Sequence, residues 1–85
     1  MNTNPHFSSI QHIFTVANQS KSGFLNYNEF IKALQLIKPT ISMKEIENYY
    51  NDNVEKGSEL IDLNKFVLIV NKYNLIAWIR TNDYF

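Results

Sequence analysis

The feature that most constrains this chain is an internal repeat at a fixed offset of 36 residues, without insertions or deletions. Self-similarity at a constant period indicates two copies of one supersecondary unit. Because one such unit cannot bury its apolar face alone, the repeat predicts two units that pack against each other. At 85 residues the chain has room for one small domain with a thin core. The matched positions are Ile10 with Ile46, Phe14 with Tyr50, Leu25 with Ile61, Asn26 with Asp62, Asn28 with Asn64, Phe30 with Phe66, Leu34 with Val70 and Ile37 with Tyr73.

Each copy has the pattern of two amphipathic helices joined by a polar loop. The segments Asn26–Glu29 and Ser42–Glu45 have the spacing of capping boxes, which mark helix starts. Asp62 is expected to cap the fourth helix, and Pro39 to end the second. The predicted buried stripes are Phe7, Ile10, Ile13, Phe14 and Ala17; Phe30, Ala33, Leu34 and Ile37; Ile46, Tyr49 and Tyr50; and Phe66, Ile69, Val70 and Tyr73.

These elements predict an all-α fold of four helices. Leu25 and Ile61 occupy equivalent positions after the two loops, where the chain is expected to be extended. We therefore expect them to lie side by side in a short, two-stranded antiparallel β-contact between the loops.

Two segments, Leu25-Asn-Tyr-Asn-Glu-Phe30 and Ile61-Asp-Leu-Asn-Lys-Phe66, resemble the closing part of an EF-hand, and Gly23 falls at the sharp turn of that motif. Ile41-Ser-Met-Lys-Glu-Ile46 looks like the linker between two hands. The chain thus resembles one lobe of the calmodulin and myosin light chain family. The resemblance implies a single lobe over residues 1–85, with hand one at 6–37, hand two at 42–73 and an apolar extension at 74–85.

The resemblance also implies metal-ligand positions in the first loop, but only one of them carries charge. Calcium takes six to eight oxygen ligands, and sensor hands supply several as carboxylates. With Glu29 as the only anion we expect no metal site, and weak calcium binding at this loop is the alternative. Asn and Ser can instead hydrogen-bond to the backbone, so the loop is expected to keep its shape without an ion. The positions are Asn18, Ser20, Ser22, the Phe24 carbonyl, Asn26 and Glu29.

The second loop is less suited to a cation. Lys65 stands at the closing position, where its ammonium would repel the ion, and Glu59 stands where the turn favours glycine. No metal or other cofactor is expected. The positions implied here are Val54, Lys56, Ser58, the Leu60 carbonyl, Asp62 and Lys65.

Composition excludes several functions. The net charge is zero and no basic run occurs, so a nucleic-acid surface is not expected. The apolar run Phe66–Val70 is too short to span a membrane. The serines lack a paired His and Asp, so we expect no enzyme activity. The expected location is the cytoplasm, in association with the cytoskeleton if the chain is a light chain.

What remains is apolar surface, and the family resemblance implies a groove that holds an amphipathic helix. We expect a calcium-independent, single-lobe light chain whose partner is an IQ-type helix, such as a myosin heavy chain neck. Val67 and Leu68 are expected to face away from the core, because Phe66–Val70 is apolar all round. The candidate partner-binding residues are Ile13, Ala17, Leu34, Ile37, Tyr49, Val67, Leu68, Ile69, Val70, Tyr73 and Trp78.

Three alternatives and one segment stay open. The chain could be a structural subunit of a large assembly, a calcium buffer, or a peptide-binding module like the Eps15-homology domain. That last family places a tryptophan on the helix before the matching loop, whereas Trp78 lies far downstream. The extension at 74–85 is too apolar for a disordered tail. It could pack on the lobe, cover the groove or join the partner contact.

Overall fold

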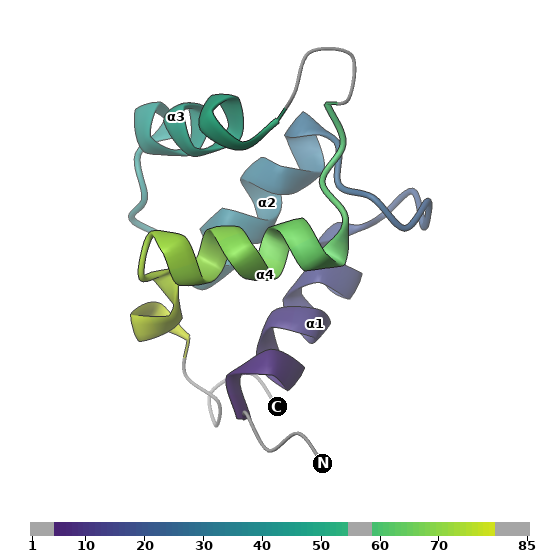
Figure 1. Ribbon diagram of the computed structural model, residues 1–85, viewed down its shortest axis with the longest axis horizontal. Helices are drawn as coiled ribbons and strands as arrows, with labels where there is room; N and C mark the ends of the chain where they lie inside the picture. The colour runs from purple at the N-terminus through teal and green to yellow at the C-terminus, as the bar shows by residue number, and fades with distance from the viewer. Residues whose placement is uncertain (1–4, 55–58, 80–85) are drawn as a thin grey trace.

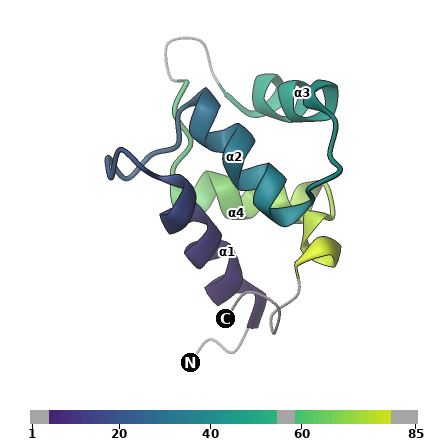
Figure 2. The same ribbon diagram turned by 180° about the vertical axis from the view of Figure 1, so that it is seen from behind.

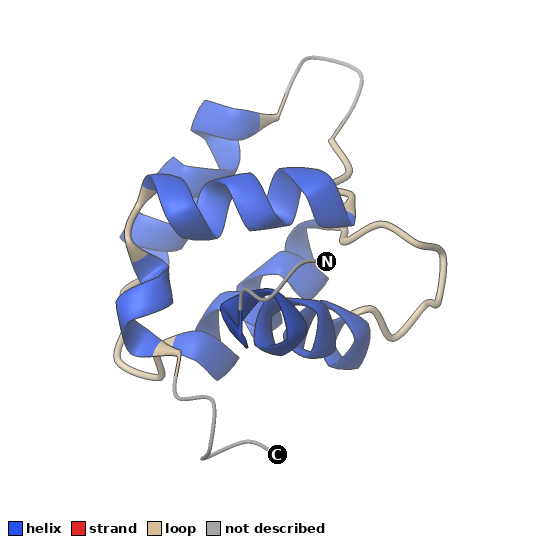
Figure 3. Ribbon diagram, turned by 60° about the horizontal axis from the view of Figure 1, so that its bottom comes forward, coloured by secondary structure: helices blue, strands red, loops and turns tan. Residues whose placement is uncertain are grey.

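The structure is a computed structural model that describes residues 5–54 and 59–79, with side chains from Ser9 onward. These residues form four α-helices and one short 3₁₀ helix, and no strand occurs among them (Figures 1 and 3). The predicted all-α class is therefore confirmed. The elements are α1 (Pro5–Ala17), α2 (Tyr27–Ile37), α3 (Met43–Asn53), α4 (Leu63–Lys72) and η1 (Leu75–Trp78).

The helices begin where their capping residues predicted. Asn26 caps α2 and Ser42 caps α3, each in a reciprocal capping box with the Glu three residues on. The Asp62 side chain caps α4 by accepting from the Lys65 N–H at 2.8 Å. Each cap satisfies backbone N–H groups that have no partner inside the helix. Helix α2 ends at Ile37, because Pro39 disfavours helical backbone at the residue before it.

The four helices pack in a closed ring of neighbours. Helix α1 contacts α2 and α4, and α3 contacts the same two helices from the other side (Figures 1 and 2). The predicted stripes face inward, except that Tyr49 and Tyr73 are only half-buried and the Phe7 side chain lies outside the described residues. The described core consists of Ile10, Ile13, Phe14, Ala17, Leu25, Phe30, Ala33, Leu34, Ile37, Ile41, Ile46, Tyr50, Ile61, Phe66, Ile69, Val70, Leu75 and Ile79.

Leu25 and Ile61 meet as expected, but the contact is smaller than a pair of strands. Each residue's N–H donates to the other's carbonyl, at 2.7 Å from Leu25 and 3.0 Å from Ile61. The two residues thus form one isolated antiparallel bridge, and the expected two-stranded contact is not seen in the described residues. Both side chains are fully buried, so the bridge fixes the two loops at the same edge of the core.

The chain leaves α4 through a sharp turn. Asn74 adopts the left-handed region (φ 57°, ψ 31°), which asparagine tolerates better than most residues. The turn ends α4 and directs η1 back against it. Leu75 and Ile79 are buried, so this part of the extension belongs to the core.

Candidate functional site

The two ends of the first loop are joined by the side chain of Glu29. One carboxylate oxygen accepts the Ser20 N–H at 2.9 Å, and the other accepts the Asn26 N–H at 3.0 Å. The Glu29 N–H in turn donates to Asn26 Oδ1 at 2.8 Å. Glu29, at the position that would close a calcium site, therefore joins the two ends of the loop through its own hydrogen bonds.

The other ligand positions of this loop are hydrogen-bonded to one another. Ser22 Oγ donates to the Phe24 carbonyl at 2.9 Å, and Ser20 Oγ donates to Ser22 Oγ at 3.2 Å. In the orientation that satisfies both ends of its amide, Asn18 donates to the Phe24 carbonyl at 3.1 Å and accepts the Gly23 N–H at 3.0 Å. The oxygens that would face an ion thus have protein partners, as the Asn and Ser content predicted.

Gly23 makes the sharp turn of this loop with φ of 88°. This backbone region is strained for residues that carry a Cβ, so glycine suits the position. A Cβ added to Gly23 would meet no atom within 4 Å, so the conformation, not crowding, is what requires glycine.

Hydrogen bonding sets the charge state of Glu29. Burial alone would raise the pKa of its carboxyl group, but hydrogen bonds from Asn26, Ser20 and Gln19 outweigh burial and hold the pKa below the ordinary 4.5. Glu29 is therefore ionised at neutral pH, and hydrogen bonds from N–H donors stabilise its negative charge. The described residues contain no group of three or more His, Cys, Asp or Glu side chains that could hold a metal ion.

Part of the second loop lies outside the described residues, including Lys56 and Ser58. On the C-terminal side of the undescribed residues, the Tyr50 hydroxyl of α3 donates to the Glu59 carbonyl, and Asp62 caps α4. The Leu60 side chain is exposed. These contacts tie the C-terminal flank of the loop to α3 and α4.

The structure places most of the predicted groove inside the lobe. Six positions lie in the core, in contact with other helices of the same chain. Tyr49, Val67 and Tyr73 are half-buried, and Leu68 and Trp78 are exposed. These six could contact a partner only if the helices that cover them moved apart. The six are Ile13, Ala17, Leu34, Ile37, Ile69 and Val70.

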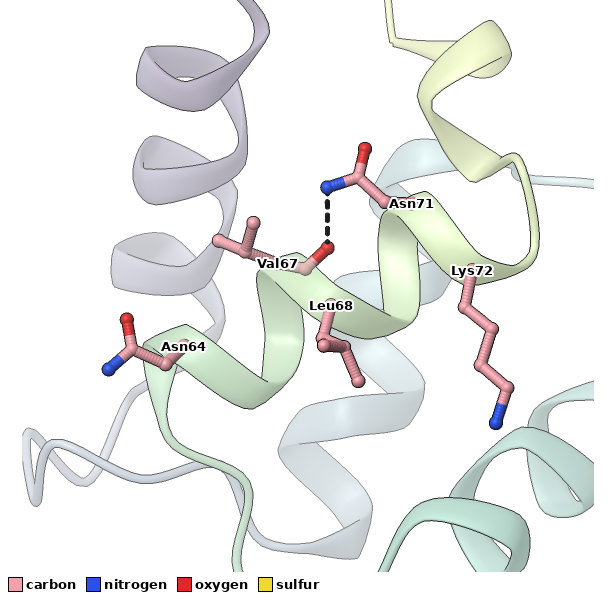
Figure 4. A pocket seen from close by; sticks show the side chains of 5 residues that line it. All are labelled: Asn64, Val67, Leu68, Asn71 and Lys72. Carbon is pink, nitrogen blue, oxygen red and sulfur yellow. Dashed lines mark hydrogen bonds between the residues drawn. The ribbon is translucent and has the colours of Figure 1, made fainter. Parts of the chain in front are cut away.

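One exposed apolar surface lies on the outer face of α4. Val67 and Leu68 line a shallow hollow of about 560 Å³, together with Asn64, Asn71 and Lys72 (Figure 4). These positions recur at the spacing of one helix face. Leu68 is 59% exposed, a large fraction for a leucine, as expected from the all-round apolar run. Asn71 donates to the Val67 carbonyl at 3.1 Å. The Val67 side chain is half-buried and packs against the core, so of the two residues expected to face away from the core only Leu68 does so.

Helix α3 flanks this face through a small tyrosine cluster. The rings of Tyr49 and Tyr73 stack with their centroids 3.9 Å apart. Asn53 donates to the Tyr73 hydroxyl at 3.0 Å, and the Lys72 ammonium donates to Asn53 Oδ1 at 3.5 Å. Burial, followed by the nearby Glu45 carboxylate, raises the pKa of Tyr49, so this phenol stays neutral near pH 7.

Sequence reasoning missed three buried positions and one hollow. Ile41, between α2 and α3, and Leu75 and Ile79, after α4, were not assigned to the core. Their apolar character was the available signal, but they fall outside the 36-residue repeat or between its helices. A second, smaller hollow of about 140 Å³ lies between α1 and α2 and is lined by His12, Ile13, Val16 and Leu36.

Comparisons with models of protein families, with curated proteins and with solved structures gave no match. The resemblance to EF-hand lobes therefore depends on the residues and the geometry described above. Among the described residues, no helix combines the length and the apolar character that crossing a membrane requires.

Proposed function

We propose that this chain is a non-catalytic, calcium-independent helix-binding lobe of the light-chain type. Its partner would be an amphipathic helix of a protein, with an IQ-type segment of a myosin heavy chain neck as the specific candidate. The single observation that carries the proposal is the first loop, in which the positions of an EF-hand metal site are hydrogen-bonded to one another. Such a lobe keeps its shape, and hence its binding surface, without a calcium signal.

The arrangement of the helices agrees with this proposal. Helices α1 with α2 and α3 with α4 would form the two hands, and the Leu25–Ile61 bridge joins their loops. The ring of contacts among the four helices is what two such hands make when they pack face to face. The exposed face of α4 then offers a first contact for a partner helix, because its apolar residues follow helical spacing.

Charge limits which helices fit. Lys72 stands at one end of the hollow on α4, and the chain as a whole is neutral. A strongly basic IQ segment would gain little attraction there, whereas an acidic side chain beside Lys72 would be favoured. The apolar face of the partner therefore has to supply most of the affinity.

A peptide titration tests the proposal. The probes are a basic IQ-type peptide without tryptophan, a peptide of the same apolar pattern with neutral charge, and a scrambled control. We expect saturable binding with the same affinity in the presence of calcium and in the presence of a chelator. Heteronuclear NMR measures this binding. Leu68→Asn should weaken binding at least about fivefold, since burying a leucine contributes about 1.5–3 kcal/mol. Met43→Asn, an exposed apolar residue on α3, serves as the matched control.

Two results would contradict the proposal. Binding that requires calcium would exclude the ion-independent mechanism. Binding of the neutral peptide alone would exclude the IQ-type partner and leave a helix-binding lobe of different specificity.

A second candidate is a permanent structural subunit, favoured by the six groove positions that lie in the core. A lobe of this kind would bind none of the three peptides, and would copurify with a fixed partner at constant stoichiometry.

A further inference from the structure

The residues that follow α4 form a short strap over one end of the core. We define the C-terminal strap as residues 75–79, which comprise η1 and Ile79. The left-handed turn at Asn74 directs the strap back onto α4. Both views place η1 beside the C-terminal end of α4 (Figures 1 and 2).

Two aliphatic side chains anchor the strap. Leu75 is 3% exposed and Ile79 is 5% exposed, and both belong to the same core as Leu34, Ile37 and Val70. These last three are among the positions at which the family resemblance implies contact with a partner helix. The strap therefore fills space next to the predicted groove.

The strap also reaches α2. The Lys38 ammonium, at the C-terminal cap of α2, lies 4.8 Å from the centre of the Trp78 ring, within the range of a cation–π contact. The strap thus contacts the C-terminal ends of both α2 and α4.

Side-chain burial holds the strap more than backbone bonding does. The Ala77 N–H donates to the Asn74 carbonyl at 3.3 Å, and the Ile79 N–H to the Ile76 carbonyl at 3.1 Å. Both bonds are local to the strap, so they do not tie it to another element. A competing apolar helix could therefore replace the strap by supplying equivalent side chains.

We infer that the C-terminal strap is an internal competitor of the partner helix, and that partner binding displaces it. This inference rests on the proposed function. The partner that replaces the strap presents two large aliphatic residues four positions apart, as Leu75 and Ile79 do. While the strap occupies the groove, the partner cannot bind there. The apparent affinity for the partner is therefore the intrinsic affinity multiplied by the fraction of molecules in which the groove is free.

The test uses a matched pair of variants, Ile79→Ala and Ile76→Ala, in the full chain. Ile79 is buried and Ile76 is half-buried on the same strap, so the same chemical change is made at an anchor and at a control position. We expect Ile79→Ala to bind the IQ-type or the neutral peptide about tenfold more tightly than wild type, because it removes part of the competition. Ile76→Ala should change the affinity by less than about twofold by the same reasoning. Circular dichroism establishes that both variants remain folded.

A second measurement needs no variant. Hydrogen exchange at the Ile79 amide of the wild type is compared with and without saturating peptide. We expect the amide to lose protection on binding, with a shift of Trp78 fluorescence as the Lys38 contact breaks.

The outcomes separate the strap from the proposed function. Equal affinities for the wild type and both variants, with unchanged protection at Ile79, would contradict the inference that the strap competes with the partner. The helix-binding function would still stand. Weaker binding by Ile79→Ala would also contradict the inference about the strap, because the strap would then be part of the binding surface. Absence of binding by every protein would overturn both.

Discussion

Glu29 holds the two ends of the first loop together, because its carboxylate accepts hydrogen bonds from N–H groups nine and three positions before it in the chain. Its oxygens accept from Ser20 and Asn26 at 2.9 and 3.0 Å. Hydrogen bonds to a charged acceptor contribute about 1.5–3 kcal/mol each, more than those between neutral groups. One side chain thus fixes both the loop and the start of α2.

Replacing Glu29 by glutamine is expected to lower the free energy of unfolding by about 2 kcal/mol at pH 7. Glutamine has one acceptor oxygen, so one of the two N–H groups would face an NH₂ donor. The pKa of Glu29 is lowered in the folded state, so its contribution is fully present well above pH 4.5 and is lost as the pH falls through the folded-state pKa. Urea unfolding across this range should therefore show the difference between wild type and Glu29→Gln shrink in acid.

Glu45→Gln is the matched control for this prediction. Glu45 also closes a capping box, but its carboxylate accepts from Ser42 alone, at 3.3 and 3.4 Å. The cost of this change should be smaller. A difference for Glu29→Gln that stayed constant from pH 7 down to pH 3 would contradict the assigned role of its charge.

At the scale of elements, α3 is the helix with the weakest attachment to the core. It buries Ile46 and Tyr50, whereas α2 buries five residues. It also contacts the C-terminal end of α4 through the stack of Tyr49 on Tyr73 and the hydrogen bonds of Asn53 with Tyr73 and Lys72. Elements with few buried contacts open at lower free energy than the whole domain.

We expect α3 amides to exchange faster than those of α2 in native-state hydrogen exchange. Tyr73→Ala should speed α3 exchange further, by about two- to tenfold, because an aromatic pair contributes about 0.5–1.5 kcal/mol beyond its buried area. Tyr73→Phe keeps the ring and loses only the hydroxyl, so its effect should be smaller. Exchange of α3 and α2 at one common rate in the wild type would show that α3 opens only with the whole domain.

The elements also show how far sequence reasoning reaches. The helix starts at Asn26, Ser42 and Asp62 were predictable, because capping depends on residues three positions apart. The burial of the predicted groove positions by other helices of the same chain was not predictable. An apolar stripe on a helix reveals which face is buried, but not whether another helix of the same chain or a foreign helix covers it. The three alternatives for the extension stayed open for a related reason, since its direction depends on one left-handed residue, Asn74.

At the scale of the whole molecule, the described helices pack around one core. Six predicted partner positions lie in the core, and the first loop satisfies its own polar groups. A calcium sensor differs in the second respect, because crowded carboxylates in its empty loops repel one another until the ion binds. We therefore expect the polar residues of this loop to determine whether the molecule as a whole responds to calcium.

Calcium in millimolar excess is expected to leave the thermal midpoint and the amide NMR spectrum of the wild type unchanged, with magnesium as the control for ionic strength. A variant with Asn18→Asp, Ser20→Asp and Ser22→Asp should behave in the opposite way. Without calcium it loses the loop hydrogen bonds and crowds four carboxylates, so it should unfold at lower temperature. Calcium at 100 times its dissociation constant would restore about 2.7 kcal/mol, which for a domain of this size corresponds to a rise of about 10 °C or more. Calcium-induced shifts confined to residues 18–29 of the wild type would show instead that the native loop binds the ion.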